Sequence, residues 1–359
     1  MAHLVKKLPI TDELSNIQPP IERAGFKTAY SIDIPFMQNR RHFLKTLAAT
    51  SLLPLPVLGA EKGKTVRIGL ITDVHKDIIH DADERLKTFI EAMTAENVDA
   101  IMQMGDFCTP KPANKGFVDL FNSFPGPKFH VLGNHDTDGG FKREQTLAFW
   151  DMKERHYSFD LGGFHFIVLD SNDRPVDFKG GYPSHIADDQ IEWLKADLEK
   201  TELNTFVISH HSLEVPVCIS SQEKVRAVLE AAKTSDGKRK VAACFNGHWH
   251  IDHSRVINGI PYHHVNSASY YWLGDKYKHE SLPPELSKQF PTVALTAPYT
   301  KPLFTLLEID GAARQFTLRG AKSAWLGPSP AELGFTSSAI NVATVRPEIT
   351  AVLETFSKA

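Results

Sequence analysis

Short apolar runs alternate with segments of helical character along most of the chain. The runs at 66–72, 99–104, 128–132, 206–209 and 241–245 are typical of strands that are buried on both faces. The segments between them, 83–95, 116–124, 145–153, 187–200 and 221–233, are predicted to be helical. In 187–200, for example, Ile191, Leu194 and Leu198 recur at helical spacing. This alternation predicts right-handed crossovers and a largely parallel sheet.

Three further pairs of strands are predicted from short alternating or apolar runs. Residues 157–160 and 164–169 are predicted to form a hairpin joined through Gly162 and Gly163. Two later strands are predicted at 255–257 and 262–265. A second hairpin is predicted from 303–309 and 315–319. The segment 274–300 is rich in Pro and Lys and is expected to be a long loop, either a lid or a binding loop. The preceding aromatic run, Tyr270-Tyr271-Trp272, either forms a stacking wall for a substrate base or packs in the core.

The amino-terminal 60 residues show a different pattern. Residues 1–36 have no sustained period, whereas 37–60 combine a basic start at Arg40-Arg41 with a short apolar run and small residues at the end. This arrangement resembles a twin-arginine export signal, with Asn39 where Ser is more usual; the alternative is a basic amphipathic surface helix. We therefore expect an upstream extension at 1–36 that is non-native or disordered, a signal at 37–60, a folded domain at 61–320, and an extension at 321–359 that is packed on the domain or trails from it.

The signal implies that the twin-arginine export machinery is a partner and that the mature protein is periplasmic or extracellular. Pro54 and Pro56 interrupt the apolar run, which is too short to span a bilayer, and no later stretch is long and apolar enough. The mature form is therefore expected outside the membrane.

Composition excludes some classes of function. Of the 359 residues, 42% are hydrophobic and 23% charged, as in an ordinary soluble globular protein, and the net charge of −3 supplies no basic field for an extended nucleic acid. Three cysteines are too few for a disulfide framework. Cys218 and Cys244 could form a disulfide in an oxidising compartment. Cys108 is expected to be a buried thiol.

Metal-binding residue types follow five of the predicted strands. Each of these residues has an ordinary structural explanation when taken alone. Asp73 could cap a helix, His75 could be a surface histidine, and Asp106 could form a hydrogen bond within a turn. Together the five strand ends supply three oxygen ligands and four imidazoles to one edge of the fold, which is more than one cation requires. Two cations that share a carboxylate fit this set, and its oxygen and nitrogen atoms suit iron, manganese or zinc. The candidate ligands are Asp73, His75, Asp106, Asn134, His210, His248 and His250.

The order of these blocks resembles the calcineurin-like metallophosphoesterases. The blocks are Asp-x-His from Asp73, Gly105-Asp106, Gly-Asn-His-Asp from Gly133, His210, and Gly-His-x-His from Gly247. The resemblance implies a four-layer αββα sandwich of two mixed β-sheets flanked by helices. It also implies two divalent or mixed-valence metal ions of unknown identity, with Asp106 bridging them. By position, the first metal would be held by Asp73, His75 and His250, and the second by Asn134, His210 and His248, with His210 preferred over its neighbour His211.

The implied activity is hydrolysis of a small phosphodiester or phosphomonoester by in-line attack of a hydroxide that bridges the metals. His135 would lie beside the phosphate and stabilise charge or protonate the leaving group, with Asp136 orienting its imidazole. Thr109 and His75 depart from the purple acid phosphatase pattern, and the sequence looks more like the cyclic-nucleotide and glycerophosphodiester phosphodiesterases. Two alternatives are a non-catalytic interaction protein on the same fold and a nuclease of the same family.

Overall fold

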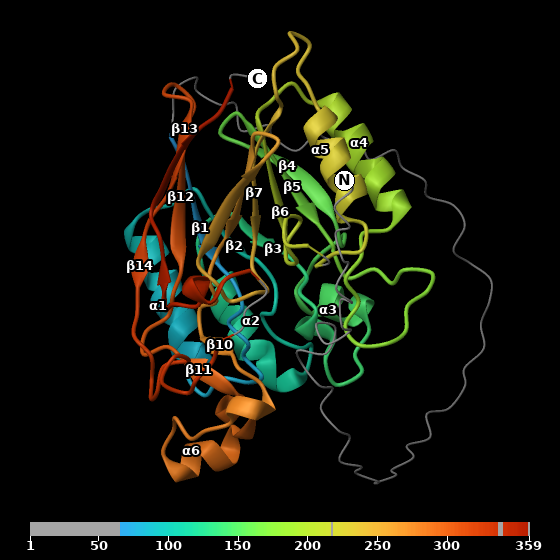
Figure 1. The fold of residues 1–359 in the computed structure, drawn as a ribbon. Helices are drawn as coiled ribbons and strands as arrows, with labels where there is room; N and C mark the ends of the chain where they lie inside the picture. Colours follow the sequence, from blue (N-terminus) through green and yellow to red (C-terminus); the bar gives the residue numbers. More distant parts are fainter. Residues whose placement is uncertain (1–64, 217, 337–339, 358–359) are drawn as a thin grey trace, which may run out of the picture.

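The computed structural model describes residues 65–216, 218–336 and 340–357, which form two β-sheets and the helices around them (Figure 1). The predicted extension at 1–36 and the predicted signal at 37–60 lie outside the described residues. Within the described ranges, no helix has both the length and the apolar character needed to cross a bilayer.

The first sheet has six strands in the order β16-β13-β12-β1-β2-β3. Strands β1, β2 and β3 are parallel to one another, whereas β12, β13 and β16 continue the sheet through antiparallel pairs. The predicted hairpin near the carboxyl terminus is therefore present as β12–β13. The strands are β1 (Val66–Ile71), β2 (Ala100–Gln103), β3 (Lys128–His130), β12 (Thr305–Asp310), β13 (Gln315–Leu318) and β16 (Val352–Thr355).

The second sheet also has six strands, in the order β4-β5-β6-β7-β9-β8. The central strands β5, β6, β7 and β9 are parallel, and antiparallel β4 and β8 close the two edges. The expectation of a largely parallel arrangement thus holds only for β1, β2 and β3 at one end of the first sheet and for the four central strands of the second, and both sheets are mixed. The strands are β4 (Tyr157–Leu161), β5 (Phe164–Leu169), β6 (Thr205–Ser209), β7 (Val241–Asn246), β8 (His253–Ile257) and β9 (Ile260–His264).

Alternation along the central strands produces four layers. In β5, Phe166 and Val168 belong to an apolar cluster shared with β1, while Ile167 and Leu169 belong to a cluster shared with helices α4 and α5. A third cluster joins the first sheet to α1 and α2. The predicted αββα sandwich is confirmed, with helices α1 (Ala82–Ala95) and α2 (Lys115–Asn122) on one side and α4 (Asp188–Lys200) and α5 (Gln222–Ala231) on the other (Figure 1).

The segment 274–300 differs from the expected long loop. It contains short helical turns and a strand, β11 (Thr296–Pro298), which pairs with β10 (Tyr270–Trp272). Its helix α6 (Pro284–Gln289) projects from the base of the molecule in Figure 1. Helical spacing gave no signal here, because α6 has only six residues and the turns η4 (Asp275–Tyr277) and η5 (Pro291–Leu295) are 3-10 helices.

The remaining elements complete the edges of the sandwich. Residues after 320 form β14 (Ala321–Lys322), which pairs with β15 (Glu348–Ile349), and the sheet strand β16. Short turns are η2 (Pro112–Asn114), η3 (His135–Thr137) and η6 (Val342–Thr344), and α3 (Arg143–Phe149) follows η3. The three cysteines are free and buried, so no disulfide joins Cys218 and Cys244.

Candidate metal centre

The candidate ligands lie in loops at the carboxyl ends of parallel strands. Asp73 follows β1, Asp106 follows β2 and Asn134 follows β3, which are neighbours in the first sheet. His210 follows β6 and His248 follows β7, which are neighbours in the second sheet. Because the sheets face each other, the loops from both meet at one edge of the sandwich, as is usual for sites in such sheets.

Left-handed backbone brings the ligands together. Five of the seven candidates have a positive φ, between 51° and 69°: Asp73, His75, Asp106, His248 and His250. Non-glycine residues in this region cost on the order of 1–3 kcal/mol each and are held there by their surroundings. Backbone hydrogen bonds supply part of that hold, from Asp73 N to Gly105 O at 3.0 Å and from His75 N to Asp106 O at 2.9 Å.

Each glycine of the motifs is required by close approach. A Cβ atom at Gly105 would collide with the imidazole of His210, and one at Gly133 would collide with the backbone and carboxylate of Asp106. A Cβ at Gly247 would strike the side chains of Thr72 and Asp73. The glycines therefore let loops from different strands touch.

The first group of candidate ligands is Asp73, His75 and His250, whose ligand atoms all lie within 4.8 Å of one another. His250 Nε2 is 3.1 Å from Asp73 Oδ1 and 3.2 Å from His75 Nε2. His250 Nδ1 donates to the Tyr270 carbonyl at 2.8 Å, which directs Nε2 of the ring into the group. Burial lowers the pKa of His75 to about 3, so this imidazole is neutral and able to ligate.

The second group is Asp106, His210 and His248, again with ligand atoms within 4.8 Å of one another. Asp106 Oδ2 lies 3.2 Å from His210 Nε2 and 3.6 Å from His75 Nε2, so one carboxylate faces both groups. Burial lowers the pKa of His210, but Asp106 and Asp73 outweigh it and raise the pKa to about 10. The carboxylates thus favour positive charge at this place. A bound cation would supply that charge instead of the second proton on the His210 ring.

Asn134 gives an independent test of whether a cation fits. Both polar atoms of its amide are buried and have no hydrogen-bond partner in the described part of the chain. An unsatisfied buried polar group costs about 1–3 kcal/mol. A cation beside the second group would satisfy the amide oxygen, and the mixed oxygen and nitrogen donors suit iron, manganese or zinc.

Of the two adjacent histidines, the structure places His210 in the second group. Its Nδ1 donates to the Met104 carbonyl at 2.9 Å, which directs Nε2 toward Asp106. The ring of His211 turns to Ser171, with Nδ1 and Oγ 2.8 Å apart.

Asp136 does not orient His135, and this prediction is wrong. The Asp136 carboxylate is fully buried and accepts four backbone N–H groups. His135 Nδ1 instead lies 2.6 Å from Asp138 Oδ2 and 3.1 Å from the Tyr182 hydroxyl. Adjacency in sequence suggested Asp136, but its side chain points back into the loops. The four donors to Asp136 are the amides of Asp106, Phe107, Cys108 and Gly133.

Tyr182 and Asp138 are the site residues that sequence reasoning missed. Asp138 lies three residues after His135, but no motif spacing drew attention to it. Tyr182 lies in an irregular loop far along the chain, where only Gly180-Gly181 before it marked a turn. Of the two readings of the aromatic run, core packing is the one that Tyr270 and Tyr271 follow, because both are buried. Tyr270 packs beneath the first group, with its ring centroid 5.0 Å from that of His75.

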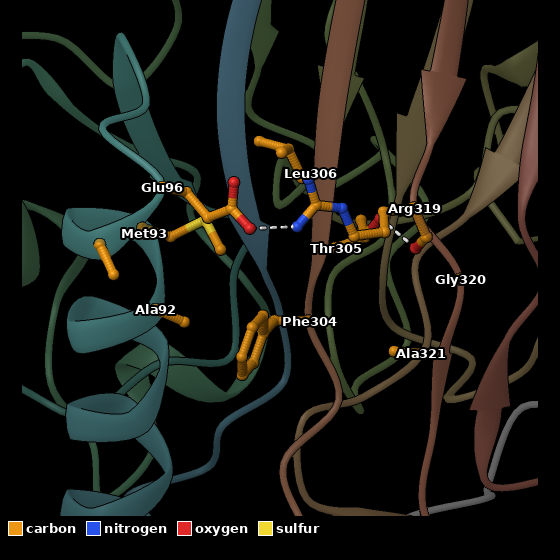
Figure 2. A pocket seen from close by; sticks show the side chains of 10 residues that line it. Ala92, Met93, Glu96, Phe304, Thr305, Leu306, Arg319, Gly320 and Ala321 are labelled. Atoms are coloured by element: carbon orange, nitrogen blue, oxygen red, sulfur yellow. Dashed lines mark hydrogen bonds and ion pairs between the residues drawn. The ribbon is translucent and has the colours of Figure 1, made fainter.

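A pocket elsewhere on the surface is separate from this centre. It has a volume of about 340 Å³ and lies between the end of α1, the start of β12 and residues 319–321 after β13. Figure 2 shows Arg319 reaching across it to Glu96, at 2.5 Å, beside Phe304 and Met93. None of its lining residues is a candidate ligand.

Comparison with known proteins agrees with this geometry. The family described as calcineurin-like phosphoesterase matches residues 66–252. A probable cyclic nucleotide phosphodiesterase of Fibrobacter succinogenes is 24% identical over 215 residues, which cover 53% of this chain and 74% of the relative. One from Rhodococcus erythropolis is 27% identical over 207 residues, covering 53% of this chain and 64% of the relative. A dimetal phosphatase from Danio rerio has a similar fold, with a TM-score of 0.53 at 14% identity, covering 81% of this chain and 99% of that one.

The family match covers more than half of the 359 residues and includes every candidate ligand. The two groups of ligands that the structure brings together are what a dinuclear-metal family requires. This chain belongs to the calcineurin-like phosphoesterase family and is a metal-dependent phosphoester hydrolase.

Proposed function

We propose that this protein is an exported hydrolase of small organic phosphodiesters or phosphomonoesters, with phosphodiesters as the first class to test. The observation that carries the proposal is the position of Asp106, whose carboxylate faces both ligand groups at once. The names of the two sequence relatives, both probable cyclic nucleotide phosphodiesterases, support the diester class.

The chain offers a place for two cations. Asp73, His75 and His250 would hold one, Asn134, His210 and His248 the other, with Asp106 shared. When bound, two such cations neutralise phosphoryl charge and lower the pKa of water near neutral pH.

His135 is the residue placed to serve the leaving group. Its ring centroid lies 5.2 Å from that of His75, so it borders the first ligand group. Its backbone N–H donates to Asp106 Oδ1 at 2.8 Å, which ties the imidazole's position to the shared carboxylate. Because Asp138 engages the Nδ1 proton, the imidazolium form of the ring would give its Nε2 proton to a departing alkoxide and keep the proton on Nδ1.

The two alternatives have less support. A non-catalytic relative would be expected to lose His135 or the shared carboxylate, and both are present. A nuclease would need a basic field along its substrate, which a net charge of −3 does not suggest.

Activity on bis(p-nitrophenyl) phosphate and p-nitrophenyl phosphate, measured with metal content, tests the proposal. We expect turnover of at least one ester that rises with occupancy up to two metals per chain, with the diester preferred. Two bound metals without turnover of either ester would favour the non-catalytic alternative.

Replacing His135 by Ala should lower kcat and leave both metals in place. A general acid contributes about 10²–10⁴-fold, and leaving groups of low pKa need it least. The loss should therefore be large for alkyl esters and small for p-nitrophenyl esters, measured as kcat across a leaving-group series. A fall in metal content would instead make His135 a ligand.

Export is tested through Arg40 and Arg41, which lie outside the described residues. Replacing both by Lys keeps the charge. The twin-arginine pathway, whose signals this segment resembles, recognises the pair of guanidinium groups. The precursor should then accumulate in the cytoplasm, as measured by fractionation and immunoblotting. Unchanged export of the Lys-Lys form would point to the general secretory route.

A further inference from the structure

Three side chains meet at His135, and their contacts go beyond the family motif. The Tyr182 hydroxyl lies 3.0 and 3.2 Å from the two oxygens of Asp138 and 3.1 Å from His135 Nδ1. Asp138 Oδ2 is 2.6 Å from the same nitrogen. The rings of Tyr182 and His135 are also in contact, with centroids 4.6 Å apart.

Only one placement of protons satisfies all of these distances. A carboxylate is acceptor-only, so a nitrogen 2.6 Å from Asp138 Oδ2 must carry a hydrogen. Since Nδ1 is then a donor, the Tyr182 hydroxyl cannot donate to it and donates to Asp138 instead. Asp138 thus accepts from both His135 and Tyr182, and charge-assisted bonds of this kind are the stronger ones.

Tyr182 reaches this position because its loop is fixed at both ends. His185 N donates to Ser171 O at 2.9 Å, and Asp173 N donates to His185 O at 3.0 Å, which closes the loop at its base. Arg143, at the start of α3, donates to Asp173 Oδ1 at 3.1 Å. The loop base is therefore fastened to the helix that follows the His135 turn.

We propose that Tyr182 and Asp138 are a positioning pair for His135. Asp138 fixes the tautomer and the ring plane, and the Tyr182 hydroxyl holds the Asp138 carboxylate in the orientation that does so. The loop 173–185 thereby takes part in setting the catalytic imidazole, although it carries no candidate ligand. The kinetic part of this inference rests on the proposed role of His135 toward the leaving group.

Three variants separate the contributions to this arrangement. Tyr182→Phe removes the hydroxyl and keeps the ring, Asp138→Asn removes the charge at nearly constant shape, and Tyr182→Ala removes the ring. Asp151→Asn, an exposed carboxylate just after α3, is the matched control. Metal content should stay at the wild-type level in all four, because neither member of the pair belongs to a ligand group.

The kinetic readout is kcat over a series of phosphodiesters whose leaving groups differ in pKa. For alkyl leaving groups we expect a loss of about 10–100-fold in Asp138→Asn and about 3–10-fold in Tyr182→Phe, within the range of a general acid. For p-nitrophenyl esters both losses should shrink toward unity with little change in KM. An equal loss for every leaving group in Asp138→Asn and Tyr182→Phe would overturn the proposal.

A second readout does not depend on activity. In the metal-free protein, the 15N resonances of the His135 ring report which nitrogen carries the proton. We expect a proton on Nδ1 in the wild type and in Asp151→Asn, and a population that carries its proton on Nε2 alone in Asp138→Asn. A wild-type ring protonated only on Nε2 would overturn the positioning pair even if the enzyme is active. The expected spectra in a protein without turnover would instead contradict the proposed function alone.

Discussion

Asp106→Asn should release both cations together and abolish nearly all turnover. One oxygen of Asp106 lies 3.2 Å from His210 Nε2 and 3.6 Å from His75 Nε2, while the other accepts the His135 N–H at 2.8 Å. The amide has no charge and only one acceptor oxygen, so it cannot serve both ligand groups and the His135 backbone. Changing an outer partner of a metal site costs about 10–100-fold, so we expect at least about 100-fold in kcat/KM for a shared ligand.

The measurement is metal per chain after dialysis against a fixed low metal concentration, together with kcat/KM for the better ester. Asp197→Asn is a suitable control, because Asp197 is a half-buried carboxylate on α4 that pairs with His165 at 2.9 Å and belongs to neither ligand group. Retention of two metals and a near-normal rate in Asp106→Asn would show that its carboxylate is not shared.

The fold was largely accessible from the sequence because its central strands are buried on both faces. Uninterrupted apolar runs such as 241–245 marked these strands, and the order of the motif blocks implied the two-sheet sandwich. Strands that depend on a distant partner gave weaker signals. The strand β10 contains the run Tyr270-Tyr271-Trp272 and exists through its pairing with β11, which only the folded chain brings alongside.

The sequence identified the candidate ligands, but the geometry that was expected to bring them together is not the one in the structure. Asp73 and His75 were expected to converge because alternate residues of an extended chain share a face. The strand β1 ends at Ile71, however, and both residues have φ near 52°, so left-handed turns bring them together. Neither composition nor periodicity reports such turns for Asp or His. The motif pattern identified the residues, and their backbone geometry had to come from the structure.

The partner of His135 could not be found by spacing. Two carboxylates follow this histidine closely, Asp136 and Asp138, and the nearer one was chosen. The distinction depends on four backbone N–H groups that point at Asp136, three from the loop after β2 and one from Gly133, and their convergence is a property of tertiary structure. Tyr182 enters through an irregular loop whose glycines and prolines signal turns but not which side chain it brings to His135.

Asp136→Asn should destabilise the folded protein strongly, in contrast to Asp138→Asn. Oδ1 of Asp136 accepts from the amides of Phe107 and Cys108 at 2.7 and 3.1 Å, and Oδ2 from those of Asp106 and Gly133 at 3.0 and 2.7 Å. Whichever way the new amide is oriented, its NH₂ group faces two N–H donors, which leaves both unsatisfied.

Each of the two buried donors that lose their acceptor costs about 1–3 kcal/mol, so we expect Asp136→Asn to lower the free energy of unfolding by about 2–6 kcal/mol. Asp138 is about a quarter exposed, with a side-chain accessibility of 23%, and water can replace its contacts. Asp138→Asn should therefore cost less than about 1 kcal/mol. Urea denaturation of the metal-free proteins measures the difference without a contribution from metal binding. Equal midpoints for the two variants would mean that the four backbone contacts of Asp136 do not hold the loops that carry Asp106 and Gly133.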